Sequence, residues 1–192
     1  MLTIEDERRY LESAGSPLPY GVMLWPASIA LAHEVFARAA ELAGKRVIEL
    51  GAGTGVPGIV AASLGADVLQ TDHSEVALHV CAMNVERNQP LAIAQRNVDW
   101  ETFASEPSDE TFDVILGSDV LYATNMHEHL HAICEKRLAP GGCVLFSDPF
   151  RAQSLPLLEA MDESGWRVSF VKYAIRVESD VRAIAVYELA RR

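Results

Sequence analysis

The sequence predicts an α/β protein with a doubly wound, mostly parallel sheet of seven strands that ends in an antiparallel hairpin. Short apolar runs rich in β-branched residues alternate with segments of helical periodicity, which is the pattern of stacked strand–helix–strand units. The last two apolar runs are separated by only seven residues, which is too short for a crossover helix. These two strands are therefore predicted to pair antiparallel at the end of the sheet.

The predicted elements follow one another from residue 45 to residue 189. Strands are expected at 45–50, 67–71, 91–95, 112–118, 142–148, 167–175 and 183–189. Helices are expected at 56–64, 75–87, 126–138 and 154–164. The helix that begins near residue 126 should end at Ala139-Pro140-Gly141-Gly142, because neither proline nor glycine continues a helix well. We expect one domain over residues 1–192, with its α/β core at 45–192 and residues 1–44 as a flank or lid.

The composition is that of a globular protein, with 49% hydrophobic and 22% charged residues. No apolar run approaches the ~20 residues that cross a bilayer, and the acidic start MLTIEDERRYLES differs from a signal peptide. Three widely spaced cysteines (Cys81, Cys134 and Cys143) fit reduced thiols, so we expect a cytoplasmic location. The net charge of −11 argues against nucleic acid and suits a small-molecule or basic protein partner. The alternating histidines of 127–131 do not share a helix face, which argues against a metal site.

A glycine-rich segment directly follows the first predicted strand. Glycines at such a turn let the backbone approach a ligand closely, and the amides of the next helix face that ligand. Counting from Gly53 gives the dinucleotide pattern G-x-G-x-x-G, but two residues then separate the strand from the first glycine, where that turn normally begins at once. Starting at Glu49, the segment is instead similar to the E-x-G-x-G-x-G signature of methyltransferases. In that signature Gly51, Gly53 and Gly55 belong to the cofactor site, and Glu49 lies near the methionine end of the cofactor.

Asp72 lies 21 residues after Gly51, at the end of the second predicted strand. A carboxylate at this position can accept hydrogen bonds from both ribose hydroxyls of a nucleoside. Asp72 could instead cap the helix that follows His73. Next to the glycine turn, ribose binding is the favoured interpretation.

Two more segments end strands at the same edge of the sheet. Asn97-Val98-Asp99-Trp100 follows the third strand, where methyltransferases recognise adenine: Asp99 would accept from the exocyclic amine and Trp100 would cover the ring. The alternative for this segment is a turn with a core-packed tryptophan. Ser118-Asp119-Val120-Leu121-Tyr122 ends the fourth strand, beside the point where ligands bind in such sheets. It lacks the two prolines of the Asn/Asp-Pro-Pro-Tyr/Phe motif of nucleic-acid amino-methyltransferases.

Together with PYGVMLWPAS (19–28), these motifs resemble methyltransferase family 16, a group of lysine-methyltransferase-like class I enzymes. The group includes the electron-transfer-flavoprotein β-subunit lysine methyltransferase and nicotinamide-methyltransferase-like proteins, and the resemblance covers roughly residues 17–150. It implies a Rossmann-like fold and S-adenosyl-L-methionine as the cofactor. It also implies that Trp25 and Ser118 lie beside the cofactor, while Asp119 and Tyr122 face the methyl acceptor.

Three functions remain open at this point. The favoured one is a protein-lysine methyltransferase, in which Asp119 would take the proton or orient the amine and Tyr122 would present its ring or hydroxyl. The second is a small-molecule N- or O-methyltransferase. The third is a non-catalytic binding module, which the intact set of Glu49, Gly51, Gly53, Asp72 and Asp119 disfavours. An NAD-dependent oxidoreductase is a distant fourth.

Overall fold

The described residues form one mixed sheet with helices on both faces. The structure, a computed structural model, describes residues 20–88, 93–177 and 179–192. The strands are β1 (Arg46–Leu50), β2 (Asp67–Asp72), β3 (Ile93–Asn97), β4 (Phe112–Ser118), β5 (Leu138–Asp148), β6 (Trp166–Val177) and β7 (Asp180–Arg191). They form a seven-stranded sheet of order β3-β2-β1-β4-β5-β7-β6. Strands β1 to β5 pair in parallel, and β7 pairs antiparallel with both β5 and β6, which confirms the predicted topology.

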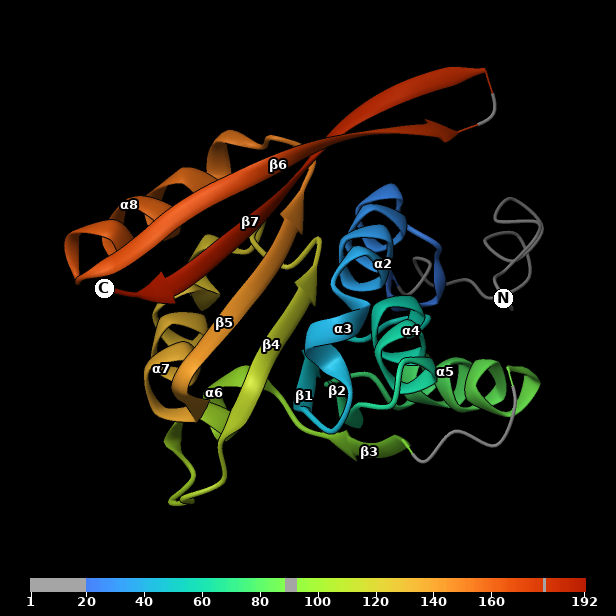
Figure 1. The fold of residues 1–192 in the computed structure, drawn as a ribbon, viewed down its shortest axis with the longest axis horizontal. Helices are drawn as coiled ribbons and strands as arrows, with labels where there is room; N and C mark the ends of the chain where they lie inside the picture. Colours follow the sequence, from blue (N-terminus) through green and yellow to red (C-terminus); the bar gives the residue numbers. More distant parts are fainter. Residues whose placement is uncertain (1–19, 89–92, 178) are drawn as a thin grey trace.

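Helices cover both faces of this sheet (Figure 1). The helices are α2 (Pro26–Ala37), α3 (Ala39–Leu42), α4 (Val56–Ser63), α5 (Glu75–Arg87), α6 (Trp100–Ser105), α7 (His127–Arg137) and α8 (Leu155–Glu163), with short 3₁₀ turns at Tyr20–Val22, Thr124–Met126 and Ala152–Ser154. One apolar cluster joins α2, α3 and α4 to the sheet, and a second joins α6, α7 and α8 to it. Val47 belongs to the first cluster and Ile48 to the second, because successive side chains of a strand point to opposite faces.

Most predicted elements are confirmed within two residues. The helix at 75–87 is α5 and the strand at 112–118 is β4. The third strand is described from Ile93 rather than residue 91, since 91 and 92 lie outside the described residues. The predicted start of the fifth strand is wrong, because β5 begins at Leu138 instead of residue 142. The pairing of β4 with β5 is irregular there, and glycine at 141 with a φ of +77° lets the chain bulge and then rejoin the ladder.

The hairpin is longer than predicted. Strand β6 ends at Val177 and β7 begins at Asp180. The sequence predicted that the first strand would end at 175 and the second would begin at 183. The additional rungs include Arg176 and Arg182, whose polar side chains interrupt the apolar runs on which the prediction depended. Figure 1 shows the hairpin reaching well beyond the end of β5.

Within the flank predicted at 1–44, the structure describes residues 20–44, and these form helices that the sequence analysis did not predict. Helix α2 packs on the sheet through Leu31 and Val35. The hydroxyl of Ser147 on β5 donates to the carbonyl of Ala27 at 2.8 Å, which fixes the start of α2 over the sheet. The sequence analysis also missed the six-residue helix α6. Across the described ranges, no helix combines the length and apolar character needed to cross a bilayer.

Candidate active site

A cavity of about 660 Å³ opens at the carboxyl ends of β1, β2 and β4. This is the edge at which open α/β sheets bind ligands, and the chain reverses its direction of winding here between β1 and β4. The volume lies within the range of small-molecule sites, about 300–1,000 Å³. The predicted site residues that line the cavity are Trp25, Gly51, Gly53, Asp72, Trp100, Ser118, Asp119 and Tyr122. Glu49, Gly55 and Asp99 were predicted to belong to the site but do not line the cavity.

The glycine loop forms a wall of bare backbone. Gly51 and Gly53 have φ angles of +63° and +55°, which glycine adopts without strain. A Cβ at Gly53 would lie 3.0 Å from the carbonyl oxygen of Gly21, so the amino-terminal segment crosses directly against the loop. A Cβ at Gly51 would lie 3.2 Å from Val120 and 3.3 Å from the Trp100 ring. Both glycines are therefore needed for close packing as well as for their backbone conformation.

The buried Glu49 side chain stabilises this loop through hydrogen bonds. Its Oε2 accepts hydrogen bonds from the Gly58 amide at 3.1 Å and from Nε2 of Gln70 at 2.8 Å. Gly58 is the third residue of α4, whose capping position, Gly55, has no side chain, so Glu49 satisfies an amide of the first turn. Complete burial raises the pKa of Glu49 to about 8, although the bonds from Gln70 and Gly58 oppose this shift. The raised pKa favours the neutral acid, and the two hydrogen bonds of Glu49 hold the loop and helix α4 in place.

Gly55 lies on the side of the loop away from the cavity. Its φ is +78°, and a Cβ there would approach Sγ of Cys81 to 2.3 Å and Nε2 of Gln70 to 2.7 Å. The same Gln70 nitrogen donates to the Gly55 carbonyl at 3.1 Å. Gly55 therefore allows β2 and α5 to pack tightly behind the loop.

Asp72 is buried at the end of β2, yet its carboxylate reaches the cavity. Its Oδ2 accepts from the Gly53 amide at 3.0 Å, and its Oδ1 accepts from the Ser74 amide at 2.9 Å. The cap of α5 is Ser74, whose hydroxyl accepts from the Ala77 amide at 3.3 Å. Each Asp72 oxygen can accept a further hydrogen bond, so the carboxylate has capacity for a ligand hydroxyl.

Asp99 and Trp100 lie next to each other at the start of α6, but only Trp100 reaches the cavity. Asp99 is exposed and caps α6, since its two carboxylate oxygens accept from the amide and the hydroxyl of Thr102 at 2.7 and 2.9 Å. The hydrogen bond from the Thr102 amide lowers the pKa of Asp99. Trp100 is half-buried and lines the cavity beside Gly51. The structure thus brings the predicted aromatic residue to the cavity, but not the predicted carboxylate.

The residues at and after the end of β4 also line the cavity. Asp119 has a φ of +58°, an uncommon conformation for a residue with a side chain. Both of its carboxylate oxygens accept hydrogen bonds from the Arg151 guanidinium, which also donates to Asp148 at 3.2 Å. This pairing with Asp119 raises the pKa of Arg151. Tyr122 is 54% exposed at the mouth of the cavity. The Asp119 carboxylate is therefore fixed in orientation by an ion pair.

Sequence reasoning missed Arg151 and the part played by Gly21, both of which line the cavity. Arg151 follows the end of β5, and β5 is the sheet neighbour of β4. The carboxyl ends of neighbouring parallel strands lie at one edge, so the loop after Asp148 could have been predicted to meet the loop that contains Asp119. Residues 1–19, including Pro19 of the PYGVMLWPAS motif, lie outside the described residues.

A sheet of this order with a glycine-walled cavity at its carboxyl edge defines the class I methyltransferase fold, and solved structures agree. The ribosomal protein L11 methylase from Lactobacillus delbrueckii subsp. bulgaricus is 26% identical with a TM-score of 0.65, and the match covers 86% of this chain and 79% of that one. The magnesium protoporphyrin IX methyltransferase of Synechocystis PCC 6803, solved with bound SAM, has a TM-score of 0.65 at 15% identity over 98% of this chain and 99% of that one. This second likeness concerns the fold alone.

The chain belongs to the lysine methyltransferase family, whose model matches residues 8–155. The protein N-lysine methyltransferase METTL21A of Mus musculus is 42% identical over 110 residues, which are 55% of this chain and 50% of that protein. The histone-arginine methyltransferase METTL23 of Xenopus laevis is 36% identical over 106 residues, which are 54% of this chain and 45% of that protein. The chain spans about half the length of the curated relatives it matches.

Proposed function

We propose that this protein transfers a methyl group from S-adenosyl-L-methionine to a lysine side chain of a protein. The observation that carries the proposal is that one cavity is lined by two chemically different sets of residues. In the proposal, the glycine loop and Asp72 form a first end for the cofactor, and Asp119, Tyr122 and Arg151 form a second end for the acceptor. Membership of the lysine methyltransferase family supports the same activity.

The first end suits the nucleoside and methionine parts of the cofactor. Asp72 would accept from the ribose hydroxyls, because each of its oxygens already accepts one amide and retains a lone pair. Trp100 would cover the adenine, and Trp25 and Ser118 line the same cavity. Gly51 and Gly53 line the cavity, and their positive φ angles and close packing against Trp100 and Gly21 set the path of the loop there. Glu49 and Gly55 would act indirectly by holding this loop, and the exposed Asp99 by starting the helix that carries Trp100.

The reaction requires a neutral amine at the second end. S-adenosylmethionine supplies a sulfonium methyl whose C–S bond breaks with its electron pair passing to sulfur, while a bond forms from carbon to the amine nitrogen. The lysine ammonium has an ordinary pKa of about 10.4, so it must first lose a proton, which passes to solvent water before the amine attacks. The carboxylate of Asp119, oriented by Arg151, would accept an amine hydrogen bond and direct the nitrogen lone pair towards the methyl. Tyr122 would contact the amine through its ring face or hydroxyl.

A protein arginine is the second candidate acceptor. The observation that favours it is the likeness to METTL23 of Xenopus laevis, described as a histone-arginine methyltransferase and 36% identical over 106 residues. A carboxylate such as Asp119 can accept from a guanidinium as well as from an amine. The small-molecule N- or O-methyltransferase remains the alternative to both.

We propose a cytoplasmic location for the protein, on the composition of the sequence.

The deciding experiment is incubation of the protein with isotopically labelled S-adenosylmethionine and a cell lysate. The labelled products are separated into proteins and metabolites, and the proteins are digested for mass spectrometry. We expect the label on lysine side chains. Label on arginine would replace the first candidate by the second, and label on metabolites alone would refute both protein substrates.

A further inference from the structure

We propose that the outer part of the β6–β7 hairpin, together with Phe150, docks the substrate protein through a segment that carries acidic and apolar side chains near the target lysine. This inference rests on the proposed function and specifies how its substrate is recognised. The surface consists of Phe150, Phe170, Lys172, Ala174, Arg176 and Val181, and we name it the hairpin platform.

Strand alternation and register place these side chains on one face of the hairpin. Residues 166, 168, 170, 172, 174 and 176 of β6 point to the same side. Near the start of this row, Trp166 and Val168 pack into the cluster formed with α7 and α8. From Phe170 outward the same side is exposed, and Val181 joins it because it pairs directly with Arg176. The platform is thus the part of this face that α8 leaves uncovered.

The apolar side chains of the platform are well exposed. Phe150 is 43% exposed, Phe170 56% and Val181 59%. The Phe150 and Phe170 rings meet edge to face, with 5.8 Å between their centroids, and the centroid of Phe170 is 5.7 Å from that of Tyr187. Phe150 and Phe170 thus form one exposed aromatic pair, and adjoining exposed apolar side chains, unlike isolated ones, indicate an interaction site.

The platform is continuous with the cavity through the loop that follows β5. Phe150 directly precedes Arg151, which lines the cavity and pairs with Asp119. Phe150 has a φ of +59°, a conformation that is unfavourable for a bulky side chain, and its ring packs on the hairpin. A polypeptide whose lysine enters the cavity past Arg151 would therefore lay its neighbouring residues over Phe150 and Phe170.

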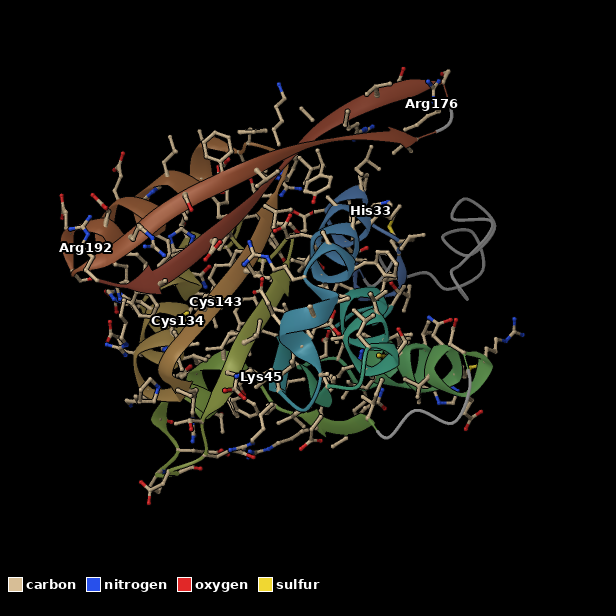
Figure 2. The ribbon with its side chains drawn as sticks, in the orientation of Figure 1. His33, Lys45, Cys134, Cys143, Arg176 and Arg192 are labelled. Atoms are coloured by element: carbon tan, nitrogen blue, oxygen red, sulfur yellow. The ribbon has the colours of Figure 1, made fainter. Side chains whose placement is uncertain are left out.

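The charge of the platform specifies the kind of partner. Lys172 and Arg176 lie on it, and the Lys172 ammonium is 6.0 Å from the centre of the Phe150 ring. Figure 2 shows Arg176 near the free end of the hairpin, so basic charge extends along the platform. On the described part of the hairpin, Asp180 and Glu188 pair with Val177 and Ser169 of the opposite face. The neighbouring carboxylate on the platform side, Asp148 of β5, is buried and accepts from Arg151. The opposite face of the hairpin carries Arg167 and Arg182 together with Asp180 and Glu188, whereas from Phe170 outward the described charged residues of the platform are both basic. The platform therefore favours a locally acidic partner segment, in contrast to the basic partner that the overall net charge of −11 suits.

The test compares two double charge reversals on the same hairpin. Lys172→Glu with Arg176→Glu alters the platform. Arg167→Glu with Arg182→Glu is the matched control, because both arginines are exposed, lie on the opposite face and give the same change in net charge. For each full-length protein we would measure methyl incorporation into lysate proteins over a series of lysate concentrations. Cofactor affinity by calorimetry, the melting temperature and the sedimentation coefficient are measured in parallel.

We expect the platform variant to raise the half-saturating lysate concentration by about tenfold and to leave the plateau rate and cofactor affinity unchanged, since like charges across an interface weaken association. The control should behave as the wild type. Equal effects of the two variants, or no effect of either, would overturn the docking proposal while the methyltransferase activity stands. A dimer that only the platform variant dissociates would identify a second copy of the chain as the occupant and would also overturn it. Absence of protein methylation by the wild type would remove the proposed function, and the docking proposal with it.

Discussion

Asp119 combines an unusual backbone conformation with an ion pair at the cavity. Its φ of +58° is one that Asn and Asp adopt more readily than other residues with side chains. The bidentate pair with Arg151 then fixes the direction in which the carboxylate points. The two features accord with the role proposed for Asp119 towards the methyl acceptor, because such backbone strain concentrates at functional sites.

Asp119→Asn should lower turnover by about 10²-fold, the loss that a misplaced reacting group commonly causes. Asparagine tolerates the same φ, so the substitution removes the charge without adding backbone strain. The measurement is the rate of methyl incorporation at saturating cofactor, with cofactor affinity as the control. A variant that retains full turnover and only melts at a lower temperature would show that Asp119 is structural.

Asp72→Ala should weaken binding of S-adenosylhomocysteine by about 1.5–3 kcal/mol, the range for hydrogen bonds to a charged acceptor. Titration calorimetry measures this directly. Asp67→Ala, at the exposed start of the same strand, is the matched control and should bind normally. Equal affinities of the two variants would remove Asp72 from the cofactor site.

At the scale of elements, the junction of β1, the glycine loop and α4 is held together by buried contacts. Glu49 joins the end of β1 to the first turn of α4, and Gln70 joins β2 to the loop. The sulfhydryl of Cys81 on α5 donates to Oε1 of Gln70 at 3.0 Å. Contacts from β1, β2 and α5 therefore fix the glycine loop, against which the ligand would lie.

Gly55→Ala should destabilise the protein more than Gly141→Ala. The two glycines have nearly the same φ, +78° and +77°, so alanine is strained by about 1–2 kcal/mol at either position. A Cβ at Gly55 would also overlap Cys81, at 2.3 Å, whereas at Gly141 it would meet nothing within 4 Å. Overpacking adds about 1–3 kcal/mol. Denaturant unfolding measures the difference, and equal losses would contradict the packing role of Gly55.

Sequence patterns predicted β1, β2 and β4 to within one residue, because a turn signal follows a largely apolar run in each, as at Phe112–Ser118. They failed where tertiary contacts decide the structure. Helix α2 has little contrast between its faces, and its position depends on packing against the sheet. The hairpin continues past Arg176 to the pair Val177–Asp180, where Val177 packs against the apolar cluster under α2, a contact between segments far apart in the chain. Asp119 was predicted at the site, but its partner Arg151 is 32 residues away in the chain and could be found only from the strand order.

At the scale of the whole molecule, a network of ion pairs and hydrogen bonds joins α2 to the hairpin. Arg38 donates to Glu34 at 2.7 Å and to Glu188 of β7 at 2.8 Å. The Tyr173 hydroxyl of β6 donates to the other oxygen of Glu34 at 2.6 Å. The helix that follows the cavity-lining Trp25 is therefore fastened to the hairpin that carries the proposed docking surface. Cavity and platform belong to one connected framework.

The pH dependence of global stability should reveal the buried acid beneath the glycine loop. Burial raises the pKa of Glu49 from its ordinary 4.5 to about 8 in the folded protein. Between these two values the folded state binds a proton that the unfolded state has released. The contribution to stability is therefore complete below about pH 4.5 and is lost as the pH rises through about 8.

Glu49→Gln should remove this contribution, since the amide resembles the protonated carboxyl and does not titrate. We expect the free energy of unfolding of the wild type, relative to the variant, to fall by up to about 1.4 kcal/mol per pH unit across this window. Urea unfolding at pH 5, 6, 7 and 8 measures the difference, and Glu41→Gln on α3 is the exposed control. A constant difference between wild type and the Glu49 variant over that range would mean that Glu49 is ionised in the folded protein. In that case the loop would be held by a buried charge instead of a neutral acid.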